Sequence, residues 1–238
     1  MGTACLNIYM EEKRMKKIIC MIMTFSVFGA GLFAKTWTNN AGVGITFPNS
    51  MVCVDEKNAD DIYQHKFGFE GVYIGVHETG FTVKGGFDAG VTTSKDVKIQ
   101  DFNTGIGFYE SITLGAGYAF VNTDATLFGM TAMLGLNADI YPHYEAYDVS
   151  GVTHEKTDTL ALVTAEVGLD FFVRHNIGNN FGFYAGLGGR YVVGGVSFFE
   201  SRDEYEDAGE EKETVADDKK LLIGNFNVRP SVGFIWKF

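Results

Sequence analysis

The chain has 238 residues, a formal net charge of −11, 30 glycines, 21 phenylalanines and only 3 prolines. An acidic chain without a basic patch repels phosphate, so these values exclude a nucleic-acid-binding protein. Abundant glycine and aromatic residues with few prolines exclude a disordered chain and favour closely packed β-strands.

The segment before residue 35 has the pattern of a secretory signal peptide. Met15, Lys16 and Lys17 precede the apolar stretch 18–33, and Ala34 is a small residue at the expected cleavage site. The apolar stretch is short for a membrane-anchoring helix. We therefore expect residues 1–34 to be an N-terminal extension with a cleavable signal peptide, translated from Met15. Residues 35–238 are expected to form one domain.

After residue 34, apolar residues alternate with small or polar residues in blocks of strand length. The eight predicted strands are 36–47, 67–77, 81–93, 105–121, 126–141, 159–174, 181–199 and 221–238. Short turns follow the second, fourth and sixth strands. Longer, charged stretches follow the others, at 48–66, 94–104, 142–158 and 200–220. Short turns on one rim and long loops on the other are typical of outer-membrane barrels. The predicted fold is all-β, an eight-stranded antiparallel up-and-down transmembrane β-barrel.

The two faces of each predicted strand differ in a way that indicates which one meets lipid. In the block 105–121, even positions such as Phe108 and Leu114 are apolar, whereas odd positions such as Gly107 and Thr113 are small or polar. A soluble lipocalin-like barrel would instead carry apolar residues inside and many charges outside. The pattern predicts a lipid-facing exterior around a narrow lumen of small and polar side chains.

Aromatic residues gather near the predicted strand ends, where membrane interfaces favour them. Ordinary β propensity also places aromatic residues in strands, so the pattern has a second explanation. The residues expected at the periplasmic interface are Trp37, Phe81, Tyr118, Phe120, Phe181, Phe183, Trp236 and Phe238. Those expected towards the outer interface are Tyr109, Tyr141, Phe198 and Phe199.

Several charged residues fall on the predicted lumen face. They are Lys84, Asp88, Asp139, Glu166, Asp170, Arg190, Arg229 and Lys237. Charges in a narrow interior need partners, because unpaired burial is costly. One interpretation is a salt-bridge network that fills and stiffens the barrel. The other is a gate or selectivity ring that decides which solutes pass. Glu166, Arg190 and Arg229 lie mid-strand in three consecutive blocks, and we expect them to form one connected cluster.

The last eight residues carry a polar residue, a glycine and two aromatic residues at a fixed spacing. Ser231, Gly233, Trp236 and Phe238 occupy these positions, and the segment resembles the C-terminal β-signal of outer-membrane proteins. The resemblance implies recognition by the barrel assembly machinery.

The layout of 36–238 resembles small eight-stranded barrels of the OmpW, OmpX and OmpA membrane-domain type. It implies a bacterial outer-membrane location among outer-membrane lipids, with extracellular loops and periplasmic termini. Families of this shape include narrow channels, surface adhesins and stability proteins, and the fold does not choose among them.

The longer connections offer candidates for binding. The stretch 200–220 holds ten acidic and four basic residues, and it is either a solvated loop or a contact surface for a cation or a host partner. The stretch 142–158 carries Tyr144 and Tyr147, which either anchor a partner or pack within the loop. Cys53 stands alone after signal cleavage, and we expect it to be inert.

No catalytic motif occurs: the chain lacks G-x-S-x-G, HExxH and CxxC. We therefore expect no enzyme activity, no cofactor and no metal. The first functional hypothesis is a narrow, porin-like channel for small solutes. The alternative is a surface-exposed adhesin or host-interaction protein that acts through its acidic extracellular loops.

Overall fold

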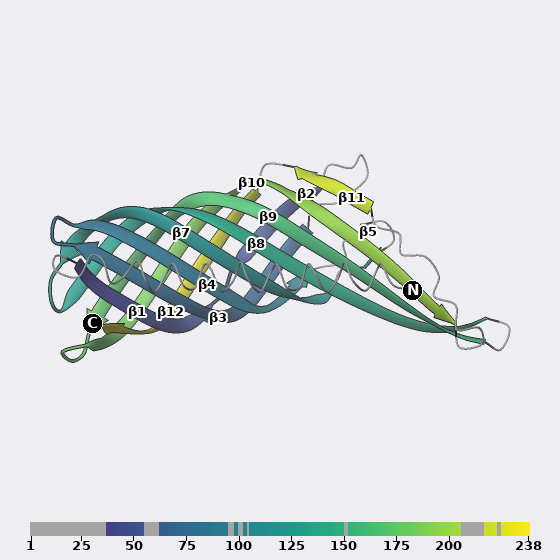
Figure 1. The fold of residues 1–238 in the computed structure, drawn as a ribbon, viewed down its shortest axis with the longest axis horizontal. Coiled ribbons are helices and arrows are strands. Elements are labelled where there is room, and N and C mark those ends of the chain that lie inside the picture. Colours follow the sequence, from purple (N-terminus) through teal and green to yellow (C-terminus); the bar gives the residue numbers. More distant parts are fainter. Residues whose placement is uncertain are drawn as a thin grey trace, which may run out of the picture.

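The computed structural model describes residues 37–54, 62–94, 98–99, 102–103, 105–149, 152–205, 217–222 and 225–238. The predicted signal peptide, 1–34, lies outside the described residues. Within the described part, the chain consists almost entirely of β-strands that form a barrel, with the C-terminus at the rim of the short turns (Figure 1). No helix in this part of the chain is long and apolar enough to cross a membrane.

Eight strands close the ring, as predicted. Its order is β1 (Trp37–Thr46), β3 (Ile62–His77), β4 (Phe81–Ser94), β7 (Ile106–Asn122), β8 (Thr126–Val149), β9 (Val152–Asn176), β10 (Phe181–Tyr205) and β12 (Asn225–Lys237). Every neighbouring pair is antiparallel, and β1 closes the ring on β12 from Asn40↔Lys237 to Thr46↔Ser231. A closed ring leaves no sheet edge along the wall, as a hydrocarbon environment requires.

The prediction that 48–66 is a loop was wrong in part, because β2 and the start of β3 lie in it, and the eighth predicted strand is divided in two. Past Pro48, β2 (Asn49–Val54) continues the line of β1 and pairs with both β3 and β12. At the other end of the chain, β11 (Asp217–Leu222) continues the line of β12 and pairs with β10 and β2. Proline has no backbone N–H and so interrupts a ladder. A separate small hairpin joins β5 (Lys98–Ile99) to β6 (Phe102–Asn103).

The prediction that 142–158 is a loop was wrong. β8 and β9 pair residue for residue out to Val149↔Val152, and β10 continues to Tyr205 beside β9. In 200–220, the residues up to 205 and from 217 are strand, and 206–216 lie outside the described residues. Apolar alternation ends where both faces of a strand leave the lipid. Backbone pairing continues past that point because it still satisfies the N–H and C=O groups.

The short turns carry the local signals expected of them. Gly80 ends the turn between β3 and β4 with a φ of 91°, a region that side chains with a Cβ rarely adopt. The Tyr118 ring packs against this glycine, and a Cβ there would lie 2.6 Å from the ring. The backbone N–H of Gly80 donates to the carbonyl oxygen of His77 at 2.8 Å. The turn and the neighbouring strand β7 therefore fit together only with glycine at this position.

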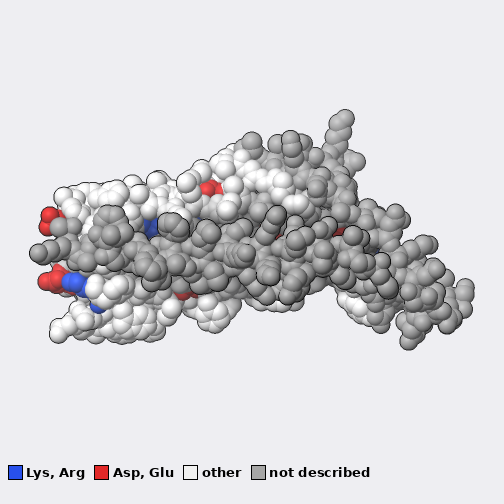
Figure 2. Space-filling view, viewed as in Figure 1, with Lys and Arg blue, Asp and Glu red and all other residues white. Residues whose placement is uncertain are grey.

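The exterior is apolar along the strands. On β7, Phe108 is 59% and Leu114 64% exposed, whereas Ser111 is buried. In Figure 2, the parts of the wall that are not grey are mostly uncharged, and acidic and basic residues gather at the turn rim (left). At that rim the Trp37 ring lies 5.9 Å from Phe81, and the Phe181 ring lies 5.4 Å from Trp236.

At the other end, the predicted positions of two aromatic residues were wrong. Tyr109 and Tyr141 are 1% and 0% exposed, inside the barrel. On each strand, the residue two positions earlier also faces into the barrel. The alternation of side chains along a strand therefore places both rings inside, although tyrosine favours the membrane interface. Phe198 does face outward and is 44% exposed, and Phe199 is half-buried.

The lumen is less polar than predicted. Its half nearest the turns is filled by a cluster of buried apolar side chains. They are Val72, Ile74, Val76, Ala119, Leu127, Phe172, Tyr184 and Ile235. Eight strands enclose a space that side chains can just fill, so bulky residues pack there as in a soluble core.

Candidate functional site

The candidate site is the layer of charged side chains above the apolar cluster. We call it the central charged layer, and it consists of Lys84, Asp88, Glu166, Asp170, Arg190 and Arg229. Each of these residues is at most 6% exposed. They come from β4, β9, β10 and β12. Lys84 and Asp88 are four residues apart on one strand, and so are Glu166 and Asp170, so the side chains of each pair lie on the same face of their strand.

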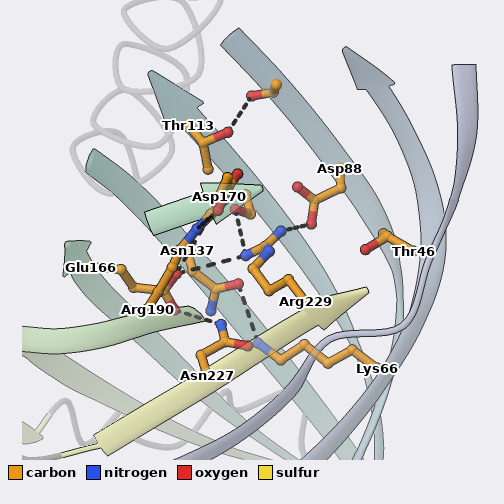
Figure 3. Close-up of polar contacts among 12 residues, drawn as sticks. Thr46, Lys66, Asp88, Thr113, Asn137, Glu166, Asp170, Arg190, Asn227 and Arg229 are labelled. Carbon is orange, nitrogen blue, oxygen red and sulfur yellow. Dashed lines mark hydrogen bonds and ion pairs between the residues drawn. The ribbon is translucent and has the colours of Figure 1, made fainter. Parts of the chain in front are cut away.

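Two arginines connect this layer. The Arg229 guanidinium is paired with Asp88 and donates to the Ser111 hydroxyl at 3.1 Å. The Arg190 Nη2 donates to Asp170 Oδ2 at 2.9 Å, and its Nε donates to Oδ1 at 3.3 Å. Both arginines reach Glu166, whose Oε2 lies 3.8 Å from Arg190 Nη1 and 3.7 Å from Arg229 Nη1. The structure thus brings together the three residues expected to form one cluster (Figure 3).

Lys84 completes the chain of ion pairs. Its Nζ lies 3.0 Å from Asp170 Oδ2 and 5.7 Å from the centre of the Tyr184 ring. Asn227 donates to Glu166 Oε1 at 2.9 Å and so occupies the second oxygen of that carboxylate. Alternating charges therefore run without a break from Lys84 to Asp88.

Asp139 belongs to a second, separate group further from the turns. Its Oδ1 lies 2.5 Å from Lys66 Nζ, and Asn137 donates to its Oδ2 at 2.7 Å. Beside it, Gln64 Nε2 donates to the Tyr141 hydroxyl at 2.7 Å. This group explains why a tyrosine is accommodated inside the barrel: its hydroxyl has polar partners there.

Lys237 does not lie in the lumen. It is half-exposed at the turn rim, where its Nζ lies 2.7 Å from Asp124 Oδ1. The hydrogen bond and the charge of Lys237 lower the pKa of the Asp124 carboxyl. The prediction from strand parity was wrong here because the side chain sits at the end of β12, where it reaches the turn after β7.

Sequence reasoning missed four inward charges among the described residues: Lys66, Glu70, Asp158 and Arg174. Lys66 and Asp158 fell in predicted loops that are strand. Glu70 lies four residues after Lys66 on the same strand and therefore on the same face. Arg174 lies four residues after Asp170, just as Asp170 lies four residues after Glu166, so all three share one face of β9. Parity counted from the outward Phe67 and Phe69 would have found the first two. Arg174 is 1% exposed and donates to Asn40 Oδ1 at 2.5 Å and to the Thr123 carbonyl at 3.1 Å.

The central charged layer and the apolar cluster together form a packed core rather than an open pore. The charged layer is nearly out of reach of water, and the apolar cluster beside it is at most 5% exposed. Buried ion pairs with several hydrogen bonds hold fixed positions, because breaking one leaves an uncompensated charge. The described side chains therefore fill the lumen at the level of these two layers.

The remaining candidates have simpler surroundings. Within the described residues, no three His, Cys, Asp or Glu side chains are grouped so that they could hold a metal ion. His65 bonds with Asn49, His77 with Thr79 and His175 with Thr126, all in exposed positions. Cys53 pairs with Leu222 through the backbone of β2 and β11, and its side chain lies outside what the structure describes.

The C-terminal strand carries the four residues of the predicted assembly signal. Ser231 points inward and is buried, whereas Trp236 and Phe238 face outward at 45% and 68% exposure. Gly233 pairs with Gly44, and a Cβ there would lie 2.5 Å from the Gly44 Cα. This contact lies in the seam that closes the ring.

Comparison with known proteins supports the fold. No protein-family model and no curated protein matches the sequence. A major outer membrane protein from Thermus thermophilus is similar in structure, with a TM-score of 0.54, 12% identity and coverage of 82% of this chain and 99% of that one. OprG from Pseudomonas aeruginosa, an outer membrane protein, matches with a TM-score of 0.49, 11% identity and coverage of 85% and 96%.

The matches also include the outer membrane protease OmpT from Escherichia coli. Its TM-score is 0.36, its identity 8%, and the coverage 87% of this chain and 98% of that one. The likeness to the Thermus thermophilus protein, at 12% identity, supports the fold alone, which is a small β-barrel.

Proposed function

We propose that this protein is a non-catalytic outer-membrane barrel that displays a projecting β-sheet for binding at the cell surface. In this arrangement the short turns and the C-terminus face the periplasm, and the long strands extend outside the cell. The observation that carries the proposal is the length of three consecutive strands: β8, β9 and β10 have 24, 25 and 25 residues. A tilted strand needs about 9–11 residues to cross the hydrocarbon layer.

The extensions of these strands form a sheet of their own. Among the described residues, β7 pairs with β8 as far as Phe108↔Ile140, and β11 pairs with β10 as far as Phe199. Beyond these points, the three strands pair with one another out to Val149↔Val152 and Tyr205↔His154. The sheet leaves the barrel as a narrow blade (right in Figure 1).

The base of this blade has features suited to binding. Tyr144 is 59% exposed on β8, and a large, rigid ring with a hydroxyl group is a common anchor in protein interfaces. The edges of a projecting sheet also offer backbone groups to an incoming strand. The packed lumen supports the same proposal, because a filled barrel serves well as a rigid support.

The test is a variant with a shortened blade. Residues 144–157 are replaced by Asn-Gly, so that His143 and Asp158, which already pair, flank a two-residue turn. The full chain and the variant are displayed on a non-adherent bacterium, and adhesion to epithelial monolayers is counted. We expect adhesion to be lost while the heat-modifiable barrel band on a gel is retained. Equal adhesion by both chains would reject the proposal.

A narrow channel is the second candidate, and the central charged layer favours it. A lumen built only for stiffness can be filled with apolar side chains, whereas this one holds six linked charges, the kind of group that selects among solutes in a pore. Single-channel recordings in planar bilayers test this candidate. Conductance that changes in Arg190→Gln or Arg229→Gln would support it, and a silent wild-type barrel would reject it.

We further propose that the assembly machinery recognises the C-terminal strand through Ser231, Gly233, Trp236 and Phe238, as the resemblance implies. The outward position of Trp236 and Phe238 supports this, because those rings are accessible along the seam. Slower appearance of the folded band for Phe238→Ala in cells would be the expected result, and unchanged assembly would contradict it.

A further inference from the structure

The charges at the level of the central charged layer do not balance. Its cations are Lys84, Arg190 and Arg229, and the carboxylates around them are Glu70, Asp88, Glu166 and Asp170. Lys66 and Asp139 neutralise each other nearby. Arg174 is held at the turn rim by Asn40 and backbone carbonyls. One negative charge is therefore left over in a closed lumen, where an uncompensated charge is costly.

Glu70 is the carboxylate without a partner. It is half-buried, and its Oε2 is shielded from solvent and has no hydrogen-bond partner among the described residues. It lies close enough to Lys84, Asp88 and Tyr184 to act on them electrostatically. A neutral oxygen also lies near Glu70, because the Thr113 hydroxyl and the Glu70 carboxylate are both beside Gly86. A Cβ built on Gly86 would lie 2.9 Å from Thr113 Oγ1 and 3.9 Å from Glu70 Oε1.

A second buried group points to the same place. Tyr109 is 1% exposed, and its hydroxyl has no hydrogen-bond partner among the described residues. The hydroxyl rests against Gly68, the inward position between Lys66 and Glu70 on β3. Glu70 and Asp88 both act on it electrostatically. A buried phenol oxygen without a donor or acceptor is a costly arrangement that an ion or water at this position would relieve.

We propose that the lumen binds one monovalent cation, such as Na⁺, beside Glu70. The Glu70 carboxylate supplies the charge, and neutral oxygens, with the Tyr109 hydroxyl first among them, complete the coordination. Hard cations prefer oxygen ligands of this kind. A single positive charge balances the layer, whereas a divalent ion would exceed it.

The test is the dependence of folding on the cation. Purified full-length barrel in detergent micelles is unfolded with urea in NaCl or choline chloride at equal ionic strength, so that general screening is constant. If one Na⁺ binds only the folded state, the folding equilibrium constant rises up to tenfold for each tenfold rise in Na⁺. Glu70→Gln removes the excess charge, so its folding should not depend on Na⁺ and should be no weaker than wild type in choline chloride.

Glu110→Gln is the matched control. Glu110 is an exposed carboxylate on the outer face of β7, and its removal should leave the Na⁺ dependence intact. If Glu70→Gln does not fold, excess ²³Na line broadening by wild-type barrel over empty micelles still tests the site. Equal stability of the wild type in both salts, without such broadening, would overturn the proposal. Stability that ignores Na⁺ and rises as the pH falls would also overturn it, because a proton would then neutralise Glu70.

Discussion

Replacing Arg229 with methionine tests whether the lumen is as closed as its packing indicates. Arg229 is 6% exposed and is paired with Asp88, which is 3% exposed. Its other guanidinium nitrogen lies 3.7 Å from the buried Glu166. Methionine keeps much of the volume and removes the charge, so that Asp88 loses its ion-pair partner inside the barrel.

The expected loss is large because the remaining carboxylate is buried. Removing one partner of a buried ion pair costs about 3–5 kcal/mol, whereas an exposed pair is worth about 0–1 kcal/mol. Adding Asp88→Asn to Arg229→Met removes the stranded charge and should recover part of this loss. Neighbouring residues of this kind show coupling energies of about 0.5–3 kcal/mol, and we expect a value towards the upper end.

The measurement is urea unfolding in lipid vesicles, followed by the fluorescence of Trp37 and Trp236. Lys237→Met serves as the control, because its partner Asp124 is exposed at the rim and the midpoint should scarcely move. A cost below about 1 kcal/mol for Arg229→Met, with no coupling to Asp88→Asn, would refute the reasoning. Such a result would mean that water screens these charges and that the lumen is open.

Three further results are expected from the same unfolding assay. Gly80→Ala forces a Cβ against the Tyr118 ring at a φ of 91° and should cost about 1–3 kcal/mol. Phe172→Ala opens a cavity in the apolar cluster and should cost about 3–5 kcal/mol; a much smaller loss would mean that this half of the lumen is loosely packed. Lys237 lowers the Asp124 pKa below its ordinary 3.8, so the advantage of wild type over Asp124→Asn should be present above that pH. It should vanish as the pH falls through the lowered pKa, and an advantage that persists in acid would contradict the pairing.

The ring of eight strands could be predicted from the sequence because the lipid imposes a strict alternation. Phe108, Leu114 and their neighbours had to be apolar on one face, so the period of two was visible in every wall segment. The same signal located the short turns at Gly80 and before Thr126. Where lipid no longer contacts the strand, as beyond Ile140 on β8, the constraint disappears, and strand and loop look alike in sequence.

The inner face was harder to predict because two different rules apply to it. Strand parity placed Asp88, Glu166 and Arg229 inside, and the structure has them there. Residue type misplaced Tyr109, which was expected at the outer interface, and Phe172 was assigned to neither face. Inside a ring of eight strands, such side chains fill the space between strands, and only parity distinguishes them from lipid-facing ones.

The register between neighbouring strands decides which charges pair inside the barrel, and this register cannot be read from a single sequence. Arg190 stands directly across from Gly168 on β9, yet its guanidinium reaches Asp170 and Glu166 on either side. Sequence spacing alone therefore yields the set of inward charges but not their pairs.

The packed lumen and the projecting blade imply that stability and binding can be changed separately. Substitutions such as Arg229→Met or Phe172→Ala act on side chains buried within the ring, and they should lower stability without altering adhesion in barrels that remain folded. Shortening the blade at His143 and Asp158 removes strand that pairs beyond the ring, and it should alter adhesion without lowering the unfolding midpoint of the wall. A channel would behave differently, because the residues that set its conductance are the same ones that hold the lumen together. Stability and activity would then change together across the Arg190 and Arg229 variants, and this pattern separates the two candidate functions even before a ligand or a solute is known.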